Sequence, residues 1–204
     1  MDALLAPLLA PWFMLWGSPV TALEVAAFGA ALAMVALNMR VNPWAWPLAI
    51  FSSVAYALLF ADARLYGEAG LQGLFIAVSL WGWWQWLYGR QRDGQMLRVR
   101  HLCTRGRLIA LALTLTAWPL LGTLLARATD SDVPYWDAFA TVASVTGQWL
   151  LARKYVDNWP VWVVVNVVSV TLFAYKGLWL TVALYALFAV LALIGWRAWR
   201  VRAA

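Results

Sequence analysis

Residues 158–162 of the chain read Asn-Trp-Pro-Val-Trp, and residues 42–46 read Asn-Pro-Trp-Ala-Trp. Two apolar segments follow each stretch. They are closed by Gly-Trp-Arg-Ala-Trp at residues 195–199 and by Gly-Trp-Trp-Gln-Trp at residues 82–86. The chain therefore contains a duplicated apolar unit. Duplication of this kind in a short chain is typical of transporters whose binding site lies between the two copies.

The composition argues against a soluble domain. Hydrophobic residues make up 65% of the 204 residues and charged residues only 12%, whereas about a quarter of a soluble domain is charged. The apolar segments approach the roughly 20 residues that a bilayer-spanning helix needs. The net charge of +6 comes from Arg and Lys in short loops, which favours membrane topology over nucleic-acid binding.

The sequence predicts an all-α, multi-pass membrane protein, because backbone polar groups in lipid must be satisfied within each segment. Seven core transmembrane helices are expected at residues 20–37, 44–60, 67–87, 108–125, 136–152, 160–174 and 178–196. The first three and the last three would form two copies, and the fourth would restore their common orientation. This is a parallel 3+1+3 repeat with its pseudo-twofold axis along the membrane normal.

The expected organisation has six parts: an N-terminal interfacial segment at 1–16, a first repeat at 17–88, a basic loop at 89–107, a linker helix at 108–126, a second repeat at 134–199 and a tail at 200–204. The first part could instead be an extra helix. Arg and Lys concentrate in the basic loop, after the fifth helix and in the tail. The positive-inside rule therefore predicts an external N-terminus and a cytoplasmic C-terminus.

Polar residues within the apolar helices are candidates for a binding site. Trp162, Asn166 and Ser169 fall at i, i+4 and i+7, which is one helical face. An asparagine buried in a bilayer should face the bundle interior, where the alternative to ligand binding is an interhelical hydrogen bond. An overlay of the copies at Trp46 and Trp162 pairs Ser53 with Ser169.

In the third helix of each copy the overlay shifts by three residues and pairs Gln72 with Tyr185. A carboxamide both donates and accepts hydrogen bonds, which suits a ligand that carries an amide; the alternative for Gln72 is contact with water or a loop carbonyl. The indoles of Trp46 and Trp162 could stack on a flat ring and would attract a cationic one. The alternative for either tryptophan is a place in the aromatic belt of the membrane interface.

No constellation for catalysis, metal binding or energy coupling is present in the sequence. Cys103 is the single cysteine and His101 the single histidine, so neither a disulfide nor a metal cluster is expected. Four of the carboxylates lie near helix ends, at Glu24, Asp62, Glu68 and Asp137. No carboxylate is therefore expected within the membrane to carry a coupled proton. These features predict a protein that is not an enzyme, uses no cofactor and favours facilitated diffusion.

Several blocks resemble the PnuC family of nicotinamide riboside transporters. The second half does so at residues 135–137 (Tyr-Trp-Asp), 152–159 (Ala-Arg-Lys-Tyr-Val-Asp-Asn-Trp) and 162–170 (Trp-Val-Val-Val-Asn-Val-Val-Ser-Val). The first half agrees at Leu65-Tyr66, Leu71-Gln72 and Gly82-Trp83. The resemblance covers about residues 20 to 199, and the block from Arg153 to Ser169 is its most specific part.

The resemblance implies a SWEET-like fold and a homotrimer in the bacterial inner membrane, with membrane lipid and a small molecule as partners. It implies facilitated diffusion of nicotinamide riboside, which cytoplasmic phosphorylation traps. Gln72, Trp162 and Asn166 match the family's binding pattern. We expect them to hold the carboxamide, the pyridinium ring and the ribose hydroxyls, respectively.

Two alternatives remain at this level. Related family members move thiamine or riboflavin, so the same fold could carry one of these vitamins or another nucleoside. A second alternative is a non-transporting membrane subunit or sensor.

Overall fold

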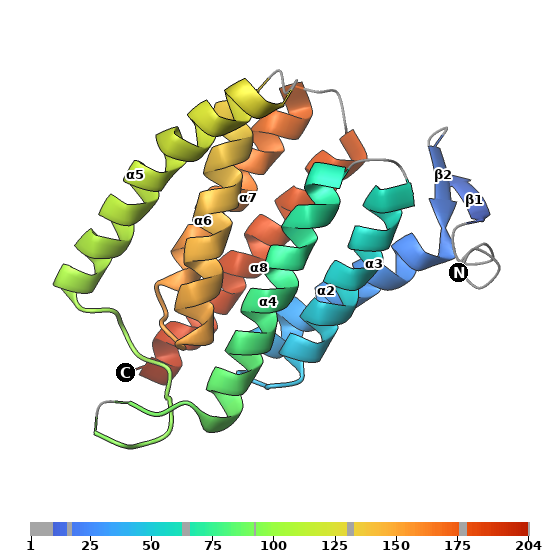
Figure 1. The fold of residues 1–204 in the computed structure, drawn as a ribbon. Helices are drawn as coiled ribbons and strands as arrows, with labels where there is room; N and C mark the ends of the chain where they lie inside the picture. Colours follow the sequence, from blue (N-terminus) through green and yellow to red (C-terminus); the bar gives the residue numbers. More distant parts are fainter. Residues whose placement is uncertain are drawn as a thin grey trace. The chain divides into compact units, whose positions relative to one another are not determined.

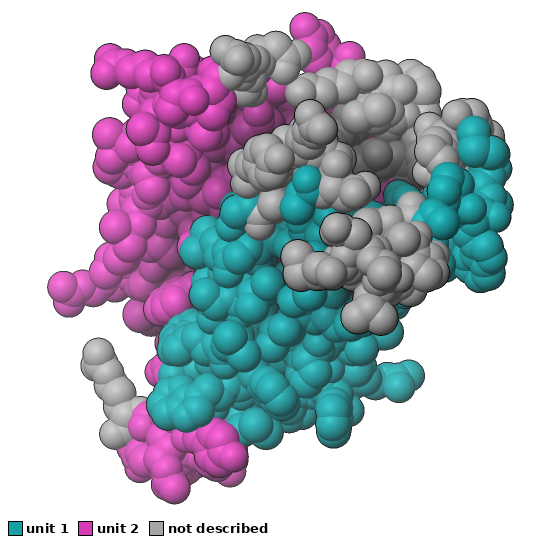
Figure 2. Space-filling model, turned by 45° about the vertical axis from the view of Figure 1, so that its right-hand side comes forward, with its two compact units in different colours: residues 1–87 teal, residues 88–204 magenta. Residues whose placement is uncertain are grey.

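The computed structural model describes residues 10–15, 18–62, 66–91, 93–129, 133–175 and 179–203. The chain divides into two compact units, Met1–Leu87 and Tyr88–Ala204 (Figure 2). In chain order the elements are β1 (Pro11–Leu15), β2 (Ser18–Thr21), α2 (Ala22–Met39), α3 (Ala45–Asp62), α4 (Tyr66–Tyr88), α5 (Thr104–Ala128), α6 (Pro134–Ala152), α7 (Asn158–Tyr175) and α8 (Trp179–Ala203) (Figure 1).

The predicted helical membrane fold is confirmed. By length and composition, three of the described helical stretches could cross a membrane: Ala22–Met39, Thr104–Ala128 and Val182–Ala203. Two shorter stretches, Ala45–Leu59 and Asn158–Leu172, are also apolar.

A short antiparallel hairpin, β1–β2, precedes the helices and was not predicted. It falls partly in the expected interfacial segment, of which residues 1–9 and 16 lie outside the described part of the chain. Trp12 and Phe13 on β1 are exposed. The hairpin ends at Thr21, whose hydroxyl oxygen accepts a hydrogen bond from the Glu24 N–H at 3.1 Å. This contact caps α2, because it satisfies one of the free N–H groups of the first turn.

The two groups of three helices are copies that keep one constant spacing. The first residues of α3 and α7, Ala45 and Asn158, differ by 113 in residue number. Gly82 of α4 and Gly195 of α8 also differ by 113. The last residues of α2 and α6 do so as well. The repeat therefore runs without insertion or deletion through all three helices.

The turn after the first helix of each copy has the same backbone. Val41 has a φ of 59° and Lys154 a φ of 56°, although glycine, which has no Cβ, is the residue that adopts this left-handed region without strain. In the first copy, the Asn42 N–H donates to the Leu37 carbonyl at 3.0 Å, and in the second the Tyr155 N–H donates to the Leu150 carbonyl at 2.9 Å. These are matching Schellman caps, which turn the chain into the next helix.

A tryptophan packed on a glycine joins the second and third helices of each copy. In the first copy, the Trp46 indole occupies the space where a Cβ on Gly82 would lie. Its ring meets Trp86 edge to face, with centroids 5.5 Å apart and planes at 87°. Both tryptophans are buried.

The second copy repeats this arrangement. The Trp159 indole occupies the Cβ space of Gly195, and its ring meets Trp199 edge to face at 5.6 Å and 82°. Edge-to-face aromatic pairs add about 0.5–1.5 kcal/mol beyond their buried area. The absence of a side chain at each glycine thus lets the two helices approach closely.

These contacts correct the predicted overlay. The counterpart of Trp46 is Trp159, not Trp162, and the shared feature is a Trp-Pro pair at residues 46–47 and 159–160. The asparagines at 42 and 158 suggested a register three residues away, although they occupy different places relative to the helix start. The predicted pairing of Gln72 with Tyr185 fits the spacing of 113, and no shift between helices is needed.

Side-chain hydrogen bonds and small residues hold neighbouring helices together. In the first unit, the Ser52 hydroxyl on α3 donates to the Ala27 carbonyl of α2 at 3.1 Å. In the second unit, α5 lies along α6, and the hydroxyl oxygens of Thr114 and Thr146 are 2.8 Å apart. α7 packs against both α6 and α8.

The loop between α4 and α5 is fixed to the turn between α6 and α7, and we call this contact the clasp (residues 97–102 with 154–157). Arg100 exchanges backbone hydrogen bonds with this turn, donating to the Lys154 carbonyl at 3.1 Å and accepting from the Val156 N–H at 2.9 Å. Its guanidinium lies 4.9 Å from the centroid of the Tyr155 ring and donates to the Tyr155 hydroxyl at 3.0 Å.

Two charged side chains complete the clasp. The Lys154 ammonium donates to the Leu97 carbonyl at 3.1 Å, and burial lowers the pKa of this lysine. The Asp157 carboxylate accepts from the Leu102 N–H at 2.7 Å and pairs with Arg107 at 2.6 Å. The Arg-Lys-Tyr-Val-Asp stretch of the family resemblance therefore has a structural role in this protein.

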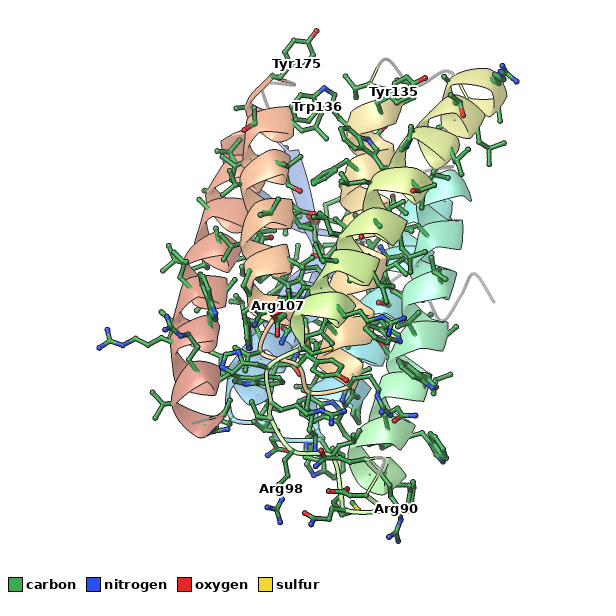
Figure 3. All side chains as sticks on the ribbon, turned by 90° about the vertical axis from the view of Figure 1, so that its left-hand side faces the viewer. Arg90, Arg98, Arg107, Tyr135, Trp136 and Tyr175 are labelled. Atoms are coloured by element: carbon green, nitrogen blue, oxygen red, sulfur yellow. The ribbon has the colours of Figure 1, made fainter. Side chains whose placement is uncertain are left out.

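The second unit has chemically different ends. Arg90 and Arg98 lie at one end, and Tyr135, Trp136 and Tyr175 lie at the other (Figure 3). Both arginines are exposed, as are the three aromatic side chains. Basic residues at one end and aromatic residues at the other are typical of a helix bundle that crosses a membrane.

Candidate substrate-binding site

The predicted site residues are divided between the two units. Trp46 and Gln72 belong to the first unit, on α3 and α4, and Trp162, Asn166, Ser169 and Tyr185 belong to the second, on α7 and α8. Each unit therefore carries only part of the predicted set.

Trp162 is half-buried on the first turns of α7, against α6. A Cβ placed on Gly147 of α6 would lie 3.3 Å from the indole Nε1 and 3.2 Å from Cε2 of Trp162. The missing side chain of Gly147 thus leaves space for the Trp162 indole between α6 and α7, and we call this space the seat of Trp162. Sequence reasoning missed Gly147, although a glycine inside an otherwise apolar helix often marks a close approach.

Asn166 lies one turn beyond Trp162 on the same helix and is 6% exposed. Ser169 is also buried. No hydrogen bond from either side chain occurs within the described residues. A buried carboxamide without a protein partner is costly, and a ligand that supplies hydroxyls or an amide could satisfy it.

Trp46 has different surroundings. It is 1% exposed, because its ring is covered by Gly82 and Trp86. This packing gives Trp46 a structural role in the first repeat. The residue that occupies the position of Trp162 in the first repeat is Ala49, which offers no ring.

Gln72 and Tyr185 occupy equivalent positions on α4 and α8, and both side chains are half-buried. The Tyr185 ring meets Phe188 edge to face, with centroids 6.2 Å apart. The third helix of each repeat therefore supplies a polar group, a carboxamide in one and a phenol in the other.

An open cavity of about 350 Å³ lies at the other end of α7 from Trp162. It is lined by Val133, Trp136, Thr171, Leu172 and Tyr175. No group of three or more His, Cys, Asp and Glu side chains that could hold a metal occurs in the described part of the chain.

The sequence is similar to a known protein family and to individual transporters. The family described as nicotinamide mononucleotide transporter matches residues 21–201. The nicotinamide riboside transporter PnuC of Escherichia coli is 27% identical over 168 residues, which cover 71% of this chain and 70% of that protein. The riboflavin/roseoflavin transporter RibM of Streptomyces davaonensis is 31% identical over 182 residues, which cover 84% of this chain and 81% of that protein.

The fold is also that of a solved structure. The crystal structure of the vitamin B3 transporter PnuC superposes with a TM-score of 0.71 at 20% identity, over 87% of this chain and 80% of that one. With the match over residues 21–201, these similarities show that the chain belongs to the nicotinamide mononucleotide transporter (PnuC) family of membrane transporters.

Proposed function

We propose that this protein takes up nicotinamide riboside by facilitated diffusion, and that phosphorylation in the cytoplasm traps the product. The observation that carries the proposal is the pair on α7. Asn166 is buried and makes no side-chain hydrogen bond to any residue that the structure describes, and it lies one turn from a tryptophan packed on Gly147. In a family of membrane transporters, such a pair suits a flat ring joined to a hydroxylated sugar.

Each proposed ligand group has a defined task. The face of the Trp162 indole attracts a cationic pyridinium ring, and the Asn166 carboxamide binds ribose hydroxyls. Gln72 binds the carboxamide of the substrate from the first repeat, with Tyr185 and Ser169 as further polar contacts. Micromolar affinity requires about 8 kcal/mol, which one stacked ring and a few hydrogen bonds can supply in a dry site.

We also propose that the two repeats are parallel copies and that one copy moves against the other during transport. The constant spacing of 113 residues supports two equivalent three-helix copies, and α5, which lies between them in the sequence, would give them the same direction across the membrane. The exposed Arg90 and Arg98 support a cytoplasmic location for their end of the second unit. The N-terminus is then outside and the C-terminus inside, in a bacterial inner membrane.

We also propose a homotrimer. The support is that, among the described helices, α5 packs mainly against α6 and leaves a row of leucines exposed. Lipid or a neighbouring copy could cover this row, and the mass of the protein in detergent or nanodiscs distinguishes a trimer from a monomer.

Riboflavin is the second candidate substrate. It is favoured by the 31% identity to a riboflavin/roseoflavin transporter over 84% of this chain. Riboflavin also combines a flat ring with a polyhydroxylated chain, so the same residues could bind it. Competition between the two vitamins for the purified protein decides between them.

Uptake into proteoliposomes that contain only this protein tests the proposed mechanism. We expect nicotinamide riboside to equilibrate across the bilayer at the same final level with and without a proton or sodium gradient. Accumulation above the external concentration under a gradient would contradict facilitated diffusion. Absence of flux for both vitamins would favour a subunit or sensor.

A further inference from the structure

Two buried polar side chains on α6 have no part in the function described so far. Ser144 and Gln148 are each 8% exposed, although they lie in a helix expected to cross the membrane. No hydrogen bond of either side chain occurs among the described residues. Their spacing of four residues places them one above the other on one side of α6.

Both residues lie at the same depth as the proposed ligand groups on α7. The turn at residues 153–157 is short, so α6 and α7 run antiparallel. Gln148 precedes the last residue of α6 by four positions, and Trp162 follows the first residue of α7 by four. Ser144 and Asn166 are each eight positions from those ends. At 1.5 Å per residue, Gln148 and Trp162 are therefore both about 6 Å from the turn, and Ser144 and Asn166 are both about 12 Å from it.

The contact between Gly147 and Trp162 fixes which side of α6 faces α7. Thr146 lies about 100° to one side of Gly147 around the helix and touches α5 through Thr114. Ser144 and Gln148 lie about 60° and about 100° to the other side. They flank the seat of the Trp162 indole on the side that α5 does not occupy.

The first repeat shows that packing alone does not require polar residues at these positions. At a spacing of 113, the counterparts of Ser144 and Gln148 are Ala31 and Val35 on α2. Those of Trp162 and Asn166 are Ala49 and Ser53 on α3. A copy with the same caps and the same Trp-on-Gly contact is thus built with apolar residues at three of the four positions.

We propose that Ser144 and Gln148 are further substrate ligands, which bind the hydroxylated part of the substrate beside the ring held by Trp162. A hydroxyl and a carboxamide both donate and accept, as sugar hydroxyls do. The inference rests on the proposed function. It adds a second polar wall, from α6, to the one that Asn166 supplies from α7.

The test compares a ligand that has the ribose with one that lacks it. Binding of nicotinamide riboside and of nicotinamide to the full-length protein is measured by competition for wild type, Ser144→Ala and Gln148→Val. These changes install the residues of the first repeat. Thr146→Ala, on the α5 side of the same helix, is the matched control. Thermal melting in detergent checks that each variant is folded.

We expect each of the two site changes to weaken nicotinamide riboside binding about fivefold to tenfold, the loss typical of one hydrogen bond to a desolvated partner. Nicotinamide binding should not change, and Thr146→Ala should resemble wild type for both ligands. Folded variants that bind the riboside as tightly as wild type would overturn the inference while leaving the proposed function intact. Equal weakening of both ligands would also overturn it, because that result indicates a structural role.

If the wild-type protein binds riboflavin instead, the test uses a different ligand pair: riboflavin, and a flavin ring without the polyhydroxylated chain. We then expect the two site changes to weaken the binding of riboflavin and to leave the binding of the bare ring unchanged. A wild-type protein that binds neither pair would overturn both the proposed function and this inference.

Discussion

The two repeats share their backbone and differ in their polar side chains. Both have a left-handed residue in a Schellman cap, and both pack a tryptophan onto a glycine beside an edge-to-face partner. At the positions of Trp162 and Asn166, however, the first repeat has Ala49 and Ser53. The duplicated features maintain the fold, so the features present in one copy only are the better indicators of function.

The clasp is a second difference. Within the described parts of the chain, the turn after the first helix holds a loop in the second repeat alone, through Arg100 on Tyr155 and the Asp157 carboxylate. At the position of Asp157 the first repeat has Trp44, which is exposed. The clasp therefore holds the loop between α4 and α5 as part of the second unit.

The largest expected effect on stability comes from disrupting the Trp-on-Gly contact that the two repeats share. Gly82→Ala and Gly195→Ala should each lower the free energy of unfolding by about 2–3 kcal/mol, because the new methyl group overlaps a buried indole. Thermal melting in detergent measures the loss. Gly73→Ala, where a Cβ meets nothing within 4 Å, is the control. A large loss in one repeat only would show that the two contacts are not equivalent.

The second largest effect on stability should come from disrupting the clasp, which belongs to the second repeat. Asp157→Ala removes the acceptor of the Leu102 N–H and should cost about 1–2 kcal/mol. Its ion pair adds little of this, since the Arg107 side chain is 51% exposed. The matched change Trp44→Ala in the first repeat should leave the melting temperature unchanged. Faster proteolysis within residues 89–103 of the Asp157 variant is the second readout, and an unchanged rate would mean that the clasp does not hold the loop.

A stabilising change is expected in the first repeat. Val41→Gly should raise the free energy of unfolding by about 1 kcal/mol, because a β-branched residue at a φ of 59° is strained and glycine is not. Lys154→Gly should gain less, since it also removes the hydrogen bond to the Leu97 carbonyl. Chemical denaturation of the three proteins measures both changes. Destabilisation by Val41→Gly would contradict the shared cap.

The smallest effect concerns the seat of Trp162. Gly147→Ala places a methyl group 3.2–3.3 Å from the indole, so the ring must shift by a few tenths of an ångström. We expect about a threefold loss of substrate affinity, or about 0.6 kcal/mol. The counterpart of Gly147 in the first repeat is Met34, and Met34→Ala should leave affinity unchanged. Equal effects of the two changes would argue against a binding role for this seat.

The sequence was sufficient for the membrane class, the helices and the existence of the repeat, because these depend on composition and on aromatic signatures near helix ends. It misled on the register. Asn42 and Asn158 are chemically alike, whereas the true match at Trp46 and Trp159 depends on a glycine in another helix. The clasp could not be predicted, since Arg100 and Tyr155 meet only through tertiary packing. Gly147 was missed for the same reason.

We expect the second repeat to provide the main substrate contacts. The double variant Trp162→Ala, Asn166→Ser gives this repeat the residues of the first and directly tests that claim. Isothermal titration of nicotinamide riboside into the purified protein should show binding to wild type and none to the variant, with the two melting temperatures within a few degrees. A folded variant that retains wild-type affinity would contradict the account.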